Sequence, residues 1–209
     1  MVDFSNLYSY DFEDYAVNHL KSLGYLVNQS IIVTCACTGT GTEYDRSAQL
    51  DSVVYDIRYN IIYVVEIKSW DARYWVSADV KDTDWSYMTS PNGIITHKFN
   101  PIMQCLSHRE LLQYVLNGRL GGGYIVNSRV LFKYAVPIEG YCLSLANGIR
   151  LEGGYQSSRN VLDVYNLLKP YEDKSEKTRQ EYRQYLEAMR YNRVGIYGRT
   201  WPNIENMLY

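Results

Sequence analysis

The sequence predicts an α/β fold in which a mixed β-sheet is flanked by helices. Two observations support this prediction. Stretches with a helical period alternate along the chain with apolar strand-like runs, and the composition of 46% hydrophobic and 21% charged residues is that of a globular protein. The length of 209 residues suits one domain, or one domain with an appendage.

The first part of the chain is expected to form one helix and then three strands. Ser9 or Asp11 can cap the helix at its start, and Gly24 stands where a C-terminal cap belongs. Residues 38–45 are rich in Gly and Thr but lack the lysine of a phosphate-binding loop, so we expect an ordinary turn there. The expected helix covers residues 12–23, and the strands cover 25–37, 49–56 and 61–69.

The second part begins with residues 70–98, which are polar and show no clear period, so they predict a long irregular excursion. A helix is expected to begin at Asn100 and Pro101, because Asn is a good N-cap and Pro is favoured at the first helical position. It should end near Gly118, before a flexible joint at 121–123. The remaining expected elements are strands over 128–138 and 141–151 and helices over 159–168 and 174–191.

Domain organisation follows from this order of elements. We expect a first domain over residues 1–154 and a helical C-terminal extension over 155–209, packed on or beside it. The formal net charge of −2 argues against a protein that coats nucleic acid by charge alone. The last expected helix nevertheless carries a basic row that can grip phosphates or simply face solvent. This row contains Arg179, Arg183 and Arg190.

The expected location is the cytoplasm, with no membrane partner. No apolar run approaches the roughly 18 residues of a membrane-spanning helix, and the acidic N-terminus does not resemble a signal peptide. The four cysteines form no C-x-x-C pair, and buried free thiols are expected of them. A zinc site would require Cys35 and Cys37 to be joined by Cys105.

Two of the expected strands each carry a carboxylate where an apolar residue would be expected. Side chains alternate along a strand, so Asp51 shares a face with Val53, and Glu66 shares a face with Lys68. The strand around Glu66 is apolar on both faces, as a central buried strand is. The alternative is a surface hairpin with a Glu–Lys pair on its solvent face. The apolar strand instead predicts that the pair is buried, and burying a Glu and a Lys that have no function would cost free energy.

Asp51 and Glu66 can meet if the two strands form an antiparallel hairpin. Opposed residue numbers in such a hairpin have a constant sum, and pairing Asp51 with Glu66 places the turn between Arg58 and Tyr59, where the two apolar runs separate. Directly opposed residues hold their Cβ atoms about 4.5–5.5 Å apart, so two carboxylates there repel each other unless a cation lies between them. The pattern therefore favours a hard divalent cation such as Mg²⁺.

Two helical residues add to this constellation. Glu13 lies on the apolar face of the first helix with Val17, and Gln104 shares a face of the second helix with His108 and Leu111. Both polar side chains are therefore expected to point toward the sheet.

Two histidines and three tryptophans are further candidates for a function. His97 and His108 can form a general-base site only if they converge. The tryptophans of the irregular segment can stack on bases or pack in the core, and they are Trp70, Trp75 and Trp85.

Taken together, these motifs resemble the NERD family, the nuclease-related domain of the PD-(D/E)XK nuclease superfamily. The resemblance covers about residues 9–138, and residues 12–25 are also similar to the first helix of Mrr-like restriction endonucleases. Two departures are the Phe12-Glu13 pair, where NERD members often have Gly-Glu, and the polar stretch before Asn100. The motif residues are Glu13, Asp51, Glu66, Lys68, Trp70, Asn100, Pro101 and Gln104.

The resemblance implies a restriction-endonuclease-like core with a four-stranded mixed sheet and in-line attack of water on a phosphodiester. It implies that Asp51, Glu66 and the backbone carbonyl of Ile67 hold Mg²⁺, with Mn²⁺ as a substitute, and that Glu13 completes the site through water or a second metal. The catalytic set would be Glu13, Asp51, Glu66, Lys68 and Gln104.

In that set, Lys68 would position the attacking water and offset developing charge, and Gln104 would orient Lys68 or the phosphate. The expected function is a metal-dependent DNA endonuclease, which acts as a homodimer or with a partner protein that supplies DNA affinity. The alternatives are an RNA-cleaving nuclease and a module that binds nucleic acid or a partner without cutting.

Overall fold

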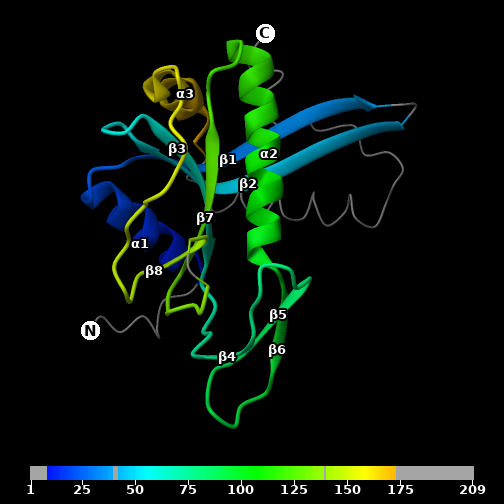
Figure 1. The fold of residues 1–209 in the computed structure, drawn as a ribbon, viewed down its shortest axis with the longest axis vertical. Helices are drawn as coiled ribbons and strands as arrows, with labels where there is room; N and C mark the ends of the chain where they lie inside the picture. The colour runs from blue at the N-terminus through cyan, green and yellow to red at the C-terminus, as the bar shows by residue number, and fades with distance from the viewer. Residues whose placement is uncertain (1–8, 40–41, 139, 173–209) are drawn as a thin grey trace.

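The main sheet of the computed structural model has five strands (Figure 1). The model describes residues 9–39, 42–138 and 140–172, with side chains described outside 9–11 and 34–47. The strands are β1 (Leu26–Gly39), β2 (Thr42–Asp56), β3 (Ile61–Lys68), β7 (Val126–Phe132) and β8 (Cys142–Ser144). Their order is β1-β2-β3-β7-β8, antiparallel from β1 to β3 and parallel from β3 to β8. The predicted mixed sheet is confirmed.

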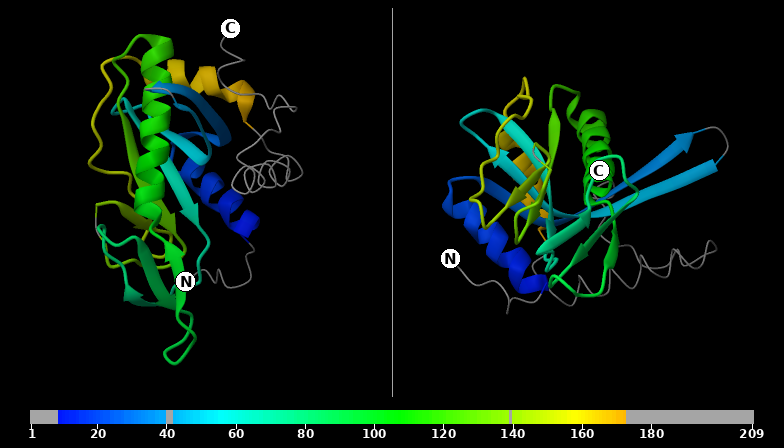
Figure 2. Two further views of the ribbon diagram at one scale, coloured as in Figure 1. Left: turned by 90° about the vertical axis from the view of Figure 1, so that its right-hand side faces the viewer. Right: turned by 60° about the horizontal axis from the view of Figure 1, so that its bottom comes forward.

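Helices cover both faces of this sheet, as predicted. They are α1 (Ser9–Ser22), α2 (Pro101–Leu120) and α3 (Val161–Leu168), followed by the 3₁₀ turn η1 (Lys169–Tyr171). Buried residues of α2 and α3 belong to one apolar cluster, and those of α1 belong to another. Figure 2 shows α1 and α2 on opposite sides of the sheet.

The central strand β3 contributes to both clusters, which explains why its sequence is apolar without alternation. Ile62 and Val64 face α2, whereas Tyr63 and Val65 face α1, and all four are fully buried. Burying an aliphatic side chain of this size contributes about 1.5–3 kcal/mol. The strand that carries Glu66 is therefore firmly held in the middle of the fold.

The predicted register of the β2–β3 hairpin is confirmed. Ser52 pairs with Val65 and Asp56 pairs with Ile61, so opposed residues have the constant sum that the sequence predicts. The turn occupies residues 57–60. It closes at Asn60, whose φ of 55° lies in the left-handed region that asparagine tolerates better than most residues.

Residues 42–45 form strand rather than the expected turn. Strands β1 and β2 remain paired as far as Gly39 opposite Thr42, so the two strands form a long antiparallel arm (Figure 1). Pairing satisfies the backbone N–H and C=O groups whatever the side chains are, and threonine suits an extended backbone. The two strands therefore extend further into this segment than its local composition predicted.

The prediction of an irregular excursion over residues 70–98 was also wrong, because this segment folds into a second sheet. It consists of three antiparallel strands, which are β4 (Tyr74–Ser77), β5 (Asp84–Met88) and β6 (Thr96–Phe99). The small sheet lies beside the start of α2 (Figure 1). Its strands have four or five residues, too few for a reliable alternation signal.

Aromatic packing attaches the small sheet to the main one. Trp85 is fully buried and stacks on Phe132 of β7 at 6.1 Å between ring centroids, and Trp75 packs edge-on against both. Trp70 stacks on Tyr87 at 5.7 Å. The three tryptophans therefore pack with other aromatic side chains, which is the packing alternative of the sequence analysis.

Helix α2 begins as predicted and runs past its predicted end. The Asn100 side chain accepts hydrogen bonds from the backbone N–H groups of Ile102 and Met103. The helix passes Gly118 and ends at Gly121, which adopts the left-handed conformation of a C-cap. Fixed at this start, α2 lies along the sheet and carries Gln104 toward β3.

The later elements are shorter than predicted. β7 ends at Phe132 rather than at residue 138, and β8 pairs with β7 over three residues only. Helix α3 begins after Asn160, which caps it. The expected helix over 174–191 and its basic row lie outside the described residues. Within the part of the chain that the structure describes, no helix is both long and apolar enough to cross a membrane.

Candidate active site

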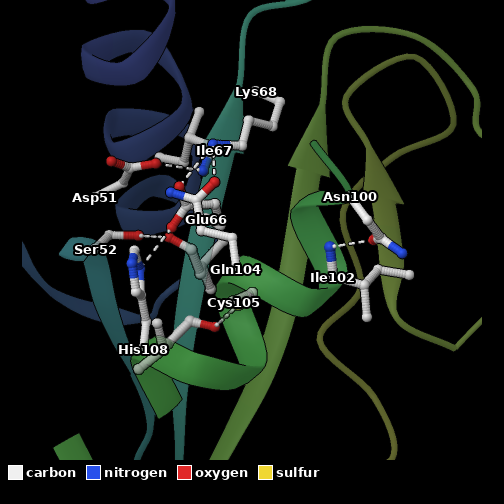
Figure 3. Close-up of polar contacts among 12 residues, drawn as sticks. Asp51, Ser52, Glu66, Ile67, Lys68, Asn100, Ile102, Gln104, Cys105 and His108 are labelled. Atoms are coloured by element: carbon white, nitrogen blue, oxygen red, sulfur yellow. Dashed lines mark hydrogen bonds and ion pairs between the residues drawn. The ribbon is translucent and has the colours of Figure 1, made fainter. Parts of the chain in front are cut away.

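The site forms where β2 and β3 stop pairing with each other. The last pair of the ladder is Ser52 with Val65, and Asp51 stands just before Ser52 on β2. The carboxylate Oδ2 of Asp51 accepts a hydrogen bond of 2.8 Å from the backbone N–H of Ile67 (Figure 3). The side chain therefore takes the place of a ladder partner, and the acid is held beside the strand that carries Glu66.

Glu66 and Lys68 form a buried ion pair on β3. The Lys68 Nζ lies 2.7 Å from Glu66 Oε1, and the side chains are 15% and 2% exposed. Lys68 also donates to the Gln104 Oε1 of α2 at 3.0 Å. The structure thus brings together Lys68, Glu66 and Gln104, as their predicted faces require.

His108 also joins the site, although the sequence analysis assigned it no role there. Its Nδ1 lies 3.0 Å from Glu66 Oε2, the oxygen that Lys68 does not contact (Figure 3). The available signal was its position one helical turn after Gln104 on the same face. His97 instead contacts the Ser86 hydroxyl at 2.8 Å, so the two histidines have different partners.

Glu13 approaches the site from α1, on the other face of the sheet. The residue is buried, in agreement with the predicted apolar face of that helix. Its negative charge lies near enough to Asp51 to contribute to the raised pKa of that carboxyl group. The charge of Glu13 therefore acts on Asp51 from the opposite face of the sheet.

Burial, together with neighbouring negative charge, disfavours the ionised form of Asp51. Burial raises the pKa of Asp51 well above its ordinary value, and the charges of Glu66 and Glu13 raise it further. Lys68 and the Ile67 N–H act in the opposite direction but do not compensate. Ionising Asp51 in the folded protein is therefore costly unless positive charge is added nearby.

Glu66 behaves in the opposite way. Burial by itself would raise its pKa, but the Lys68 ammonium and the His108 ring hold it at about 2. Burial likewise favours the neutral form of Lys68, yet the charges of Glu66 and Asp51 keep its pKa above the ordinary value. The pair is therefore ionised at neutral pH.

These donors suit a hard cation that shares its coordination with water and substrate. Carboxylate oxygens are the ligands that Mg²⁺ prefers, and one or two of them commonly suffice. Added positive charge would also relieve the repulsion that raises the pKa of Asp51. Among the described residues, no three His, Cys, Asp or Glu side chains converge into a metal cage of their own.

A buried thiol lies under the site. The Cys105 Sγ lies 3.5 and 3.3 Å from the backbone oxygens of Val64 and Arg129, so its single S–H can donate to either and lies between β3 and β7. Burial raises the pKa of this thiol, which stays protonated. The side chains of Cys35 and Cys37 lie outside the described residues, so the zinc alternative stays a prediction.

Comparison with known families and proteins adds one finding. The model of the nuclease-related domain family matches residues 9–133. The matched segment runs from the start of α1 to just beyond β7 and includes every residue of the site. Searches of curated proteins and of solved structures gave no match.

Proposed function

Since the chain belongs to the nuclease-related domain (NERD) family, we propose that it is a Mg²⁺-dependent nuclease that hydrolyses phosphodiester bonds of DNA. One observation carries the proposal. Where β2 and β3 stop pairing, Asp51 bonds to the backbone between Glu66 and Lys68, which form a buried ion pair. Burial and two neighbouring acids oppose the ionisation of Asp51, and a cation bound beside it would favour the ionised form.

In this proposal Asp51, Glu66 and the Ile67 carbonyl hold the metal. The Ile67 N–H faces Asp51, and the carbonyl of an extended residue points to the same side as its N–H. Glu13 completes the site through water. Mg²⁺, or Mn²⁺ as a substitute, supplies the Lewis acidity that polarises the phosphate and lowers the pKa of a water molecule.

Lys68 is the proposed cationic group of the reaction. Its ammonium has three N–H donors, and among the described residues two of them meet Glu66 and Gln104, so the third can serve the attacking water or the scissile phosphate. Gln104 carries no charge, so it orients Lys68 without neutralising it. Water attacks phosphorus as the bond to the leaving sugar oxygen breaks, and Lys68 offsets the negative charge that develops.

Cleavage of supercoiled and of single-stranded circular DNA, with Mg²⁺ or Mn²⁺ and against EDTA, tests the proposal. We expect metal-dependent nicking or linearisation that is lost in Asp51→Asn and in Lys68→Ala. Asp56→Asn is a matched control, because Asp56 lies on the same strand but pairs with Arg58 at the far turn. This control should cut like the wild type.

Three other results would change the assignment. Metal binding by a folded wild type without cleavage of DNA or RNA would favour the module that binds without cutting. Cleavage of RNA alone would retain the chemistry and change the substrate. Cleavage that persists in both active-site variants would place the activity elsewhere.

A further inference from the structure

The two oxygens of the buried Glu66 carboxylate are contacted from two different elements. Oε1 faces Lys68, which follows it on β3, and Oε2 faces His108 on α2. Resting on the proposed function, we infer that His108 is a positioning residue. It holds Oε2 and so fixes the orientation of the Glu66 carboxylate, which would be one of the metal ligands, with Oε1 on Lys68.

The direction of this hydrogen bond does not depend on the charge of the ring. An ionised carboxylate can only accept, so the atom of His108 that faces Glu66 must carry a proton. That atom is Nδ1, which is protonated in the imidazolium and in one of the two neutral tautomers. His108 is therefore the donor in either state.

The helix that carries His108 is anchored on both sides of this residue. Asn100 caps its start, and Gln113, beyond His108, bonds to two backbone groups, accepting from the Val126 N–H and donating to the Tyr124 carbonyl. Gln104 and His108 lie one turn apart on this anchored helix. Helix α2 therefore positions Gln104 against Lys68 and His108 against Glu66 as one rigid unit.

Without His108 the carboxylate would lose its orientation. Rotation about the last torsion of a glutamate has broad minima, so a free Oε2 allows the group to turn and give both oxygens to Lys68. A carboxylate with both oxygens bonded to Lys68 is a poorer metal ligand. Loss of an outer partner of a metal ligand typically lowers metal affinity about 10- to 100-fold.

Three substitutions at one position test the inference, with the full chain as the protein. His108→Asn places an amide N–H close to where Nδ1 stands, His108→Gln moves the donor outward to where Nε2 stands, and His108→Leu has no donor. Binding of Mn²⁺, followed by the loss of its free electron paramagnetic resonance signal, is the readout. We expect affinity to fall about 10- to 100-fold in the Leu and Gln variants and to stay within about 3-fold of the wild type in the Asn variant.

Matched controls are available at His97, which contacts Ser86 rather than Glu66. His97→Asn, His97→Gln and His97→Leu should bind Mn²⁺ like the wild type. In cleavage assays the His108→Leu variant should need more Mg²⁺ for half-maximal rate but recover most of kcat at saturating Mg²⁺. A loss of kcat without a change in Mg²⁺ requirement would overturn a positioning role.

The outcomes separate this inference from the proposed function. Unchanged Mn²⁺ affinity in folded His108→Leu overturns the inference alone, and so does an equal loss in the Asn and Leu variants. The expected pattern of affinities without any nucleic-acid cleavage overturns the proposed reaction alone. A wild type that binds no Mn²⁺ overturns both. If His108→Leu does not fold, the difference in Mn²⁺ affinity between the Asn and Gln variants still tests the inference.

Discussion

The Asp51 carboxylate accepts the backbone N–H of Ile67 at 2.8 Å, just beyond the last pair of the β2–β3 ladder. This contact ties an acid of β2 to the strand segment that carries Glu66 and Lys68. The Asp51 carboxylate is therefore fixed to the backbone of β3 one residue after Glu66.

Asp51→Asn should abolish cleavage yet stabilise the metal-free protein. The raised pKa of Asp51 means that its contribution to stability is complete below the ordinary value of 3.8 and is lost as the pH rises through the folded-state pKa. Asparagine is neutral at every pH and can still accept from the Ile67 N–H. We expect Tm in EDTA at pH 8 to rise by about 2–4 °C for each 1 kcal/mol gained.

Differential scanning calorimetry measures this effect, and Asp56→Asn is its control. Asp56 is buried and bound in a two-pronged contact by Arg58, so loss of its charge should lower Tm slightly. A lower Tm for Asp51→Asn would contradict the argument from charge repulsion.

Lys68→Met should destabilise the protein, because it leaves Glu66 buried with less positive charge around it. Removing one member of a buried ion pair typically costs about 3–5 kcal/mol, and the remaining His108 contact places the expected loss near the lower figure. The double variant Glu66→Gln/Lys68→Met should recover most of the loss. Urea unfolding in EDTA measures both, and additive losses would show that the pair is not coupled.

Acid should destabilise the protein partly through Glu66. Its folded-state pKa of about 2 lies below the ordinary value of 4.5, so its contribution is present above pH 4.5 and is lost as the pH falls toward 2. The loss should be on the order of 2–3 kcal/mol. Urea unfolding between pH 5 and pH 2.5 should show a steeper fall for Asp51→Asn than for Asp51→Asn/Glu66→Gln; equal slopes would refute the assignment.

Asn100→Asp should destabilise α2 although aspartate is normally as good an N-cap. The Asn100 amide donates to the backbone carbonyls of Asp79, Val80 and Asp82, and an ionised carboxylate cannot donate. We expect a loss of about 1–3 kcal/mol, similar to that of Asn100→Ala. Chemical denaturation distinguishes the outcomes, because a wild-type stability for Asn100→Asp would mean that only the cap matters.

The hairpin register was predictable from the sequence for a physical reason. Alternation with period two fixes which face each residue occupies, and the constant sum of opposed residues then fixes the turn at residues 57–60. The Asn100 cap and the shared face of Gln104 and His108 are equally local features. Such features depend on residues only a few positions apart.

Two of the differences from prediction concern pairing that local composition does not encode. Residues 42–45 are strand because β1 lies beside them, and the β4–β6 sheet exists because Trp85 and Trp75 pack on Phe132. Residue 132 follows Trp85 by more than forty positions. No periodicity within residues 70–98 reports that contact.

The amino-acid pattern alone was enough for the fold class, the family and the two strands that present Asp51, Glu66 and Lys68. Tertiary packing decided how helices meet those strands. It brought His108 to the second oxygen of Glu66 and brought the charge of Glu13 near Asp51. The reason is that spacing along one element determines only the face on which a residue lies, whereas the partner of that face depends on how separate elements pack.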